Sequence, residues 1–211
     1  MTRPDRRLRG FLRRSVHGPI AVWYHPTFRL PLAGLESQLG IEPRRADDVL
    51  TWALDLGLIR PADVHEAPEA SWASIRLVHD QAYLASLDRR ETLAPILGVD
   101  VRTIPTESML ETWRRSVGAT VEAAQWAVER RRPALALLGG FHHAYPDRGG
   151  GFCALNDVAV AVAVLRDQGF RGRVAILDLD AHPPDGTAAC LSGDQRVHIL
   201  VSGALFHAGQ L

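Results

Sequence analysis

The fold is decided by Val174-Ala175-Ile176-Leu177-Asp178-Leu179-Asp180-Ala181-His182-Pro183-Pro184-Asp185-Gly186. The first four residues form an apolar, partly β-branched run of the kind that fills the centre of a parallel sheet. Three carboxylates and an imidazole follow. Because side chains alternate along a strand, Asp178 and Asp180 project to one side, and His182 can rejoin that side where the strand ends. The stretch therefore predicts a buried strand that ends in a polar cluster with the spacing of metal ligands.

Carboxylates at the end of a buried strand are costly unless they are paired or bound to a metal. The run of Asp178, Asp180 and Asp185 therefore requires a cation, basic partners or both. A solvated loop after a strand is the alternative, but Asp178 still lies within the apolar run, which counts against it. We interpret residues 178–186 as part of a functional site.

Length and composition predict one compact domain. The chain has 211 residues, of which 46% are apolar and 23% charged, and its formal net charge is zero. A neutral chain has no overall field that would attract nucleic acid or an anionic membrane surface. The local exception is a cluster of arginines near the start, namely Arg3, Arg6, Arg7, Arg9, Arg13 and Arg14. We interpret residues 1–18 as a basic, disordered arm.

The sequence also indicates a soluble, cytoplasmic protein. Its two cysteines, Cys153 and Cys190, are too few for a disulfide framework or a cysteine-rich zinc site. No apolar stretch is long enough to span a bilayer, and the arginine-rich start does not lead into the apolar core of a signal peptide. We therefore expect no membrane partner.

The rest of the chain alternates between strand and helix patterns. Strands are predicted at 20–24, 134–138, 174–180 and 197–201, helices at 42–58, 71–87, 106–130 and 156–169, and a loop at 92–105. Short links between such elements indicate βαβ units and a parallel sheet covered on both faces. In such sheets ligands bind beyond the carboxyl ends of the strands, where Gly139-Gly140-Phe141-His142-His143 and residues 178–186 fall.

These two clusters have the residues needed for amide hydrolysis. A catalytic zinc keeps three protein ligands and one open position, and Asp180 and His182 could supply two of the three. A metal-bound water can lose its proton near neutral pH, and adjacent imidazoles can serve as base and acid. Asp178 and Asp185 are left to fix histidine tautomers. Structural polar residues are the alternative interpretation of the same pattern.

Three ordered blocks carry a resemblance to a known family: Gly139-Gly140-Phe141-His142-His143-Ala144, Gly151-Phe152-Cys153-Ala154-Leu155-Asn156-Asp157, and Asp178-Leu179-Asp180-Ala181-His182. They resemble the signature of the zinc-dependent histone deacetylase family, including its bacterial acetylpolyamine and small-molecule deacylase members. Tyr24-His25-Pro26 and Val78-His79-Asp80 with Tyr83 extend the likeness over most of the chain after residue 19. The resemblance implies an arginase-like α/β fold of three layers with a mainly parallel central sheet.

By this resemblance, Asp180 and His182 match two zinc ligands. His142 and His143 match the tandem active-site histidines, with Asp178 expected behind His142 and Asp185 behind His143. His143 then acts as general base and acid, and His142 acts mainly through its electrostatic effect. The implied substrate is an acylated amine such as acetyl-lysine or a polyamine.

The resemblance also implies a substrate tunnel and a second ion. Gly151 and Phe152 match the tunnel wall, where the glycine carbonyl would meet the substrate amide and the ring would pack on its methylene stem. Asp178 matches a monovalent cation site, usually potassium, although Val201-Ser202-Gly203 lacks the usual Ser and His of that site.

Two departures from the family pattern affect these expectations. Pro183-Pro184 replaces the usual His-Gly or Gln-Gly and stiffens the loop that aims Asp185 at His143. A third zinc ligand and an oxyanion-stabilising tyrosine, which family members supply beyond this point, are not found, and Asp194 is a poor substitute. We therefore expect residues 19–211 to be the N-terminal portion of a deacetylase domain, truncated at the C-terminus, with later strands missing, an edge open to a partner chain or second copy, and weak activity or none.

Two other functions stay open at this point. A catalytically inactive relative could bind an acylated amine or a partner chain without hydrolysing it. An arginase-like enzyme would use two manganese ions and an Asp two residues after the ligand histidine, where this chain has Pro184.

Overall fold

The structure is a computed structural model, and it describes residues 18–31, 40–100, 102, 104–201 and 204–206. Apart from Gly18, the basic arm predicted at 1–18 lies outside the described residues. Ser202 and Gly203, which follow the last predicted strand, also lie outside them.

The described strands form two sheets. In the first, β1 (Ala21–Tyr24) lies between β2 (Val64–Glu66) and β3 (Ala134–Ala136), and both pairings are parallel. In the second, β4 (Val174–Asp178) pairs in parallel with β5 (Val197–Val201), which pairs antiparallel with β6 (Ala204–Phe206). The mixed α/β class with mainly parallel pairing is confirmed.

The sheets differ from the expected organisation in one respect. The sequence predicts a single central sheet, but among the described residues no strand pairs with the outer edge of β3 or β4, so the two sheets stay separate. Each has its own packing partner. β1 and β3 lie against the long helix α7 (Thr106–Arg130), whereas β4 and β5 share an apolar cluster with the helices α8 (Asp157–Asp167) and α9 (Asp185–Leu191).

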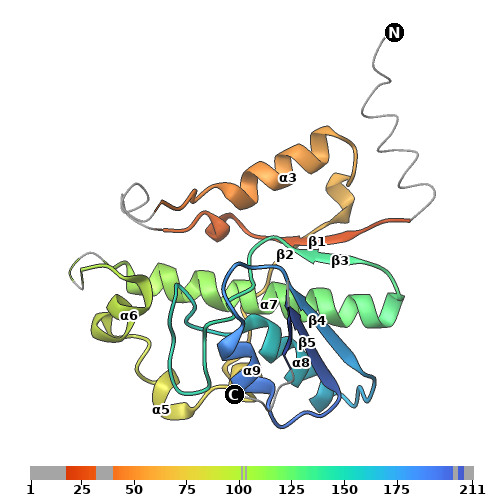
Figure 1. Ribbon diagram of the computed structural model, residues 1–211. Helices are drawn as coiled ribbons and strands as arrows, with labels where there is room; N and C mark the ends of the chain where they lie inside the picture. The colour runs from red at the N-terminus through yellow and green to blue at the C-terminus, as the bar shows by residue number, and fades with distance from the viewer. Residues whose placement is uncertain (1–17, 32–39, 101, 103, 202–203, 207–211) are drawn as a thin grey trace.

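The other helices are short and surround this framework (Figure 1). They are α3 (Arg45–Asp55), α4 (Trp72–Ile75), α5 (Gln81–Leu84) and α6 (Arg90–Leu97), with 3-10 turns at Pro26–Phe28 and Pro61–Asp63. The helix predicted at 71–87 is therefore two single-turn helices, the first capped by the Ser71 hydroxyl, which accepts from the amide of Ser74.

The loop predicted at 92–105 was wrong in its first part, because α6 extends to Leu97. Pro95 lies inside this helix and removes one backbone donor. Burial of Leu93, Ile96 and Leu97 outweighs that loss, and Gly98 ends the helix in the left-handed conformation with φ of 67°. Proline and glycine usually indicate a loop, and the burial of their neighbours, which favours the helix here, cannot be read from the sequence.

The long helix α7 is the centre of the main core. Met109, Trp113 and Val117 are almost fully buried along one stripe, whereas Val128 near the end of the helix is 42% exposed. α7 also makes the most extensive contact with α8. The Ser116 hydroxyl donates to the Leu138 carbonyl oxygen at 2.7 Å, which ties the helix to the chain that follows β3. The position of α7 therefore fixes where the tandem histidines begin.

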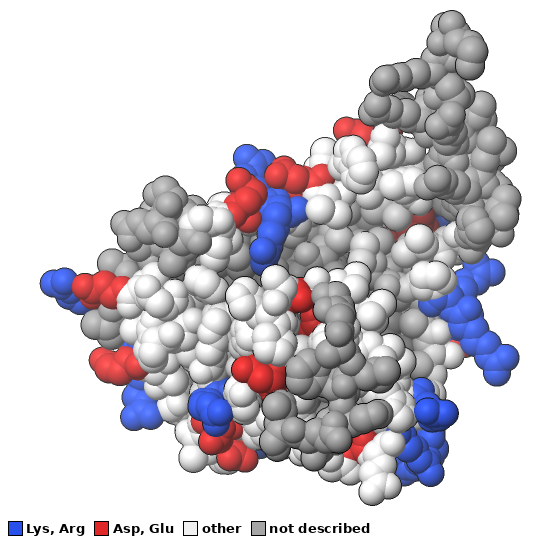
Figure 2. Space-filling view, in the orientation of Figure 1, with Lys and Arg blue, Asp and Glu red and all other residues white. Residues whose placement is uncertain are grey.

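The face shown in Figure 2 carries Arg and Asp/Glu side chains next to one another in small groups, and wide uncharged areas lie between the groups. Among the helices that the structure describes, none combines the length and hydrophobicity that crossing a bilayer requires.

Gly118 provides a test of how tightly α7 packs. Alanine normally stabilises a helix interior relative to glycine by about 1 kcal/mol. A Cβ at Gly118, however, would overlap the backbone carbonyl of Pro68 and lie 3.0 Å from the Ala70 amide. Gly118→Ala should therefore lower the free energy of unfolding by about 1–3 kcal/mol in urea denaturation. Gln125→Ala on the same helix serves as the control and should change it by less than about 0.5 kcal/mol.

Candidate functional site

Two loops that follow different strands meet through two histidine–carboxylate pairs. The chain after β3 supplies His142 and His143; Asp178 is the last residue of β4, and Asp185 is the first residue of α9. Nδ1 of His142 lies 2.8 Å from Oδ2 of Asp178, and Nδ1 of His143 lies 2.7 Å from Oδ1 of Asp185. This is the pairing expected from the sequence.

The pairs determine which ring nitrogens carry protons. An ionised carboxylate only accepts hydrogen bonds, so Nδ1–H of each histidine is the donor. Burial alone raises the pKa of Asp185, but the hydrogen bonds from His143 and the Gly186 amide outweigh it and hold that pKa below its ordinary value. Nε2 of each neutral ring then carries a lone pair and can accept a proton.

Asp180 and His182 lie beside these pairs and are more exposed. Oδ1 of Asp180 accepts from the amide of His182 at 2.8 Å and lies 3.0 Å from Nδ1 of that ring. Those bonds to His182 lower the pKa of Asp180. Nε2 of His142 is 3.9 Å from Oδ1 of Asp180, and the rings of His143 and His182 are 5.8 Å apart.

The donor atoms of Asp180 and His182 fit two positions of a zinc site. A carboxylate oxygen and a neutral imidazole nitrogen are the ligand types that zinc takes, and their separation of 3.0 Å is compatible with one shared cation. Within the described ranges, however, no group of three or more His, Cys, Asp or Glu side chains could hold a metal ion. Asp180 and His182 could therefore supply two donors to a metal, and the described residues offer no third.

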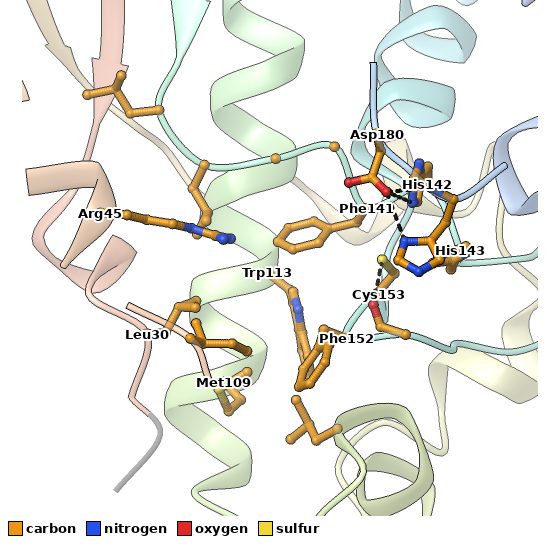
Figure 3. A pocket seen from close by; sticks show the side chains of 18 residues that line it. Leu30, Arg45, Met109, Trp113, Phe141, His142, His143, Phe152, Cys153 and Asp180 are labelled. Atoms are coloured by element: carbon orange, nitrogen blue, oxygen red, sulfur yellow. Dashed lines mark hydrogen bonds and ion pairs between the residues drawn. The ribbon is translucent and has the colours of Figure 1, made fainter. Parts of the chain in front are cut away.

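The candidate site opens into a cavity of about 730 Å³ (Figure 3), within the size range of small-molecule sites. The polar end of its lining contains His142, His143, Asp180 and His182. The remaining lining is mainly apolar or glycine and also includes one arginine: Leu30, Ile41, Arg45, Leu97, Met109, Trp113, Leu137, Leu138, Gly139, Gly140, Phe141, Gly151, Phe152 and Cys153.

Gly151 lies against His143 in this wall, and the Phe152 ring lies farther along it, near Trp113 (Figure 3). A Cβ at Gly151 would lie 2.7 Å from Cδ2 of His143, so only glycine lets the imidazole occupy this position. Phe152 adopts a φ of 67°, unusual for a bulky residue. Its amide donates to the Ile96 carbonyl at 2.8 Å, so α6 helps to hold the ring at the cavity.

Pro183 and Pro184 are compatible with the His143–Asp185 pair. Pro184 precedes the first residue of α9, where a missing amide donor costs little. The carbonyl of Pro183 accepts from the amide of Asp185 at 2.9 Å. The rigid dipeptide therefore leads directly into the helical turn that presents Asp185.

α9 also approaches the tandem-histidine loop through its backbone. The amide of Thr187 donates to the carbonyl of His142 at 2.9 Å. A Cβ at Gly186 would lie 2.5 Å from the carbonyl oxygen of Ala144 and 2.6 Å from that of His142. Glycine at 186 is thus a condition for the contact between the two loops.

Sequence reasoning missed a buried polar group behind the histidines. His79 is 2% exposed; its Nδ1 lies 2.9 Å from the carbonyl oxygen of Tyr145, and its Nε2 accepts from the amide of Asn156 at 3.0 Å. Burial lowers the pKa of His79. The available signal was a polar residue next to apolar ones in Val78-His79-Asp80, but its partners are distant in sequence.

Asn156 and Asp157 end the second of the three blocks that resemble the family. Asn156 caps α8, since its side-chain oxygen accepts from the amide of Ala159. Asp157 accepts from the amides of Gly140 and Phe141. Burial raises the pKa of Asp157, and its hydrogen bonds oppose that shift.

Other residues considered as missing parts of the site are engaged elsewhere. Asp194 accepts from Arg166 at 2.7 Å in the turn before β5. The Tyr83 hydroxyl donates to the carbonyl of Ala154, and the Tyr24 hydroxyl donates to Asp47. Asp194 therefore remains a poor candidate for a third metal ligand.

Comparison with known proteins identifies relatives of this arrangement. Residues 40–202 match the family described as histone deacetylase domain. Histone deacetylase 2 of Arabidopsis thaliana is 34% identical over 188 residues, which cover 86% of this chain and 48% of that protein. A probable deacetylase of Archaeoglobus fulgidus is 35% identical over 131 residues, which cover 61% of this chain and 36% of that protein.

A crystal structure of the HDA15 HD domain has the same fold, with a TM-score of 0.71 at 21% identity. The match covers 86% of this chain and 54% of that one. It confirms the arginase/deacetylase-like fold predicted from the sequence. The chain spans about half the length of the Arabidopsis relative and of this structure.

Gly186→Ala tests the contact between α9 and the histidine loop. The added Cβ meets backbone atoms, which cannot rotate away, so we expect α9 to shift and the His143–Asp185 hydrogen bond to break. The free energy of unfolding should fall by about 1–3 kcal/mol. Gly193→Ala is the matched control, because a Cβ there meets nothing within 4 Å. An unchanged His143 Nδ1–H signal by NMR in Gly186→Ala would contradict the proposed contact.

The depressed pKa of His79 predicts a pH dependence of stability. A free histidine is protonated below about pH 6.5, whereas folded His79 resists protonation at that pH. Below about pH 6.5 the unfolded state therefore binds more protons than the folded state does. Neutral His79 contributes its full stability above that pH, and this contribution is lost progressively as the pH falls. Between pH 7.5 and 5.5, the wild type should lose up to about 1.4 kcal/mol more unfolding free energy than His79→Gln. An equal fall in unfolding free energy in the wild type and in His79→Gln would show that His79 does not cause the pH dependence. His65→Gln is the control, because it also removes one histidine.

Proposed function

Because this chain belongs to the histone deacetylase family, we propose that its site hydrolyses the acyl amide of lysine, a polyamine or a similar amine. The observation that carries the proposal is the convergence of His142–Asp178 and His143–Asp185 beside Asp180 and His182 at the mouth of one cavity. Amide hydrolysis needs a base to deprotonate water and an acid to protonate the departing amine. A pair of oriented imidazoles meets both needs.

In this proposal His143 is the base and then the acid. Its Nδ1–H is bound to Asp185, so Nε2 is free to take a proton from the attacking water and later deliver it to the amine nitrogen. Asp185 holds the tautomer and stabilises the imidazolium that forms. The His143 side chain is 22% exposed and lines the cavity, so its ring can be reached from there.

His142 has a different proposed role. Its side chain is 8% exposed and its partner Asp178 is 15% exposed, so this pair is more buried than the first. Nε2 of His142 points toward Asp180, from which it is 3.9 Å away. We assign His142 to electrostatic stabilisation and orientation rather than to proton transfer.

Zinc is the proposed metal, since the family is zinc-dependent in general. Asp180 and His182 would hold it, together with a ligand outside the described residues. When bound, zinc would polarise the substrate carbonyl and lower the pKa of a water molecule. Asp178 is also proposed to contribute to a monovalent cation site, as its Oδ1 accepts from the amide of Asp180 while Oδ2 binds His142.

The proposed substrate enters along Gly151 and Phe152. The exposed Phe152 ring offers an apolar surface for a methylene chain, and the cavity beyond it is mainly apolar. A soluble, cytoplasmic location and a partner chain or second copy at the strand edges are further parts of the proposal.

A second candidate function is favoured by the incomplete ligand set. Asp180 and His182 have no third partner for a metal within the described ranges. A protein that binds an acylated amine or another chain without hydrolysing it would need the cavity but not the metal. Zinc content and ligand binding, measured together, separate this function from hydrolysis.

The activity test uses the purified chain with zinc, acetyl-lysine peptides and acetylpolyamines. We expect slow, zinc-dependent turnover that His143→Ala abolishes and His198→Gln, a substitution on β5, leaves intact. Turnover should be slow because the described residues supply only two of the three protein ligands that a catalytic zinc takes. Substrate binding without zinc or turnover would favour the second function, and absence of both binding and turnover would refute the proposed substrate class.

A further inference from the structure

A buried polar dipeptide stands at the start of α8, where Asn156 is the N-cap and Asp157 is the first residue of the helix. The two residues are 0% and 1% exposed, yet neither lines the cavity. Buried polar groups of this kind are costly unless they are fully hydrogen-bonded. The identity of their partners therefore shows what they hold in place.

Asp157 binds the chain just before the tandem histidines. Its Oδ1 accepts from the amide of Phe141 at 2.8 Å, and its Oδ2 accepts from the amide of Gly140 at 3.1 Å. The hydroxyl of Thr120 on α7 donates to the same Oδ2 at 2.7 Å. One carboxylate thus joins the loop to both α8 and α7.

Asn156 binds the chain just after the tandem histidines. Its Nδ2 donates to the carbonyl of Ala144 at 3.0 Å and to the hydroxyl of Thr187 at 3.1 Å. Its Oδ1 accepts from the amide of Ala159 and caps the helix. The side chain therefore has two separate tasks, which different atoms perform.

The loop needs such anchors because of its composition. Gly139 and Gly140 precede the histidines, and Gly140 has a φ of 76°, so the backbone here has little intrinsic preference for one conformation. His142 and His143 follow β3, whereas their partners Asp178 and Asp185 belong to β4 and α9. Small backbone rotations at the glycines would therefore move both rings away from their partners. Fixing residues 140 and 144 removes that freedom at both ends.

We propose that Asn156 and Asp157 are positioning residues that clamp residues 140–144 at both ends and so hold the His142 and His143 rings against Asp178 and Asp185. The consequence for catalysis rests on the proposed function, but the clamp itself does not. Loss of either anchor should release the imidazole hydrogen bonds while the helices remain folded.

The test follows the two Nδ1–H protons by NMR in protein labelled with ¹⁵N at histidine. Asp157→Asn replaces one accepting oxygen with a donor. Asn156→Ser keeps a good helix cap but is too short to reach Ala144. Thr120→Val is the matched control, because it removes a hydrogen bond to the same carboxylate without touching the loop.

We expect both clamp variants to increase exchange of the His142 or His143 Nδ1–H with water by at least about tenfold, while Thr120→Val changes it little. Circular dichroism checks that α7 and α8 remain folded, and Asn156→Ser decides the question if Asp157→Asn does not fold. Protected protons in a folded Asn156→Ser, or equal loss in Thr120→Val, would overturn the clamp. The readout needs no turnover, so it stands even if the hydrolase proposal fails.

Discussion

The site depends on one constraint, which is that the carboxylates following β4 must find hydrogen-bond donors. Asp178 is mostly buried at the end of the strand, and its two oxygens are used by Nδ1 of His142 and the amide of Asp180. The donor side chain comes from a loop after another strand, 36 residues earlier. The hydrogen bonds of Asp178 therefore join the end of β4 to the histidine loop, and this contact forms the polar end of the cavity.

That junction explains why glycines occur where the two segments meet. At Gly186 and Gly151, a Cβ would fall within 2.7 Å of the backbone of the histidine loop or of the His143 ring. Backbone approach this close excludes every larger residue unless the loops separate. The stiff Pro183-Pro184 link fits the same logic, since a fixed entry into α9 reduces the conformations available to Asp185. Pro183-Pro184 departs from the family pattern, yet it is compatible with the hydrogen bond between His143 and Asp185.

The pairing of the two histidines with Asp178 and Asp185 was implied by the family resemblance, because the partners lie 36 and 42 residues apart in the sequence. Local signals predicted the strand that contains Asp178 and the long helix at 106–130. The roles of His79 and Asp157 could not be predicted in the same way, since their partners lie 16 to 77 residues away. The same limit applies to α6, where buried Leu93 and Leu97 sustain a helix across Pro95. Burial is a property of the assembled fold, and local pattern carries little information about it.

The two parts of the candidate site differ in how they are stabilised. The histidine–carboxylate pairs are built entirely from residues 140–187, and buried groups on α7, α8 and α9 hold their backbone. Asp180 and His182 are exposed and bonded mainly to each other, with side-chain exposures of 51% and 73%. Contacts with three helices therefore hold the histidine–carboxylate pairs in place, whereas Asp180 and His182 have few contacts that would fix their orientation. A ligand that binds between Asp180 and His182 must therefore fix the orientation of both side chains, which lowers its binding free energy.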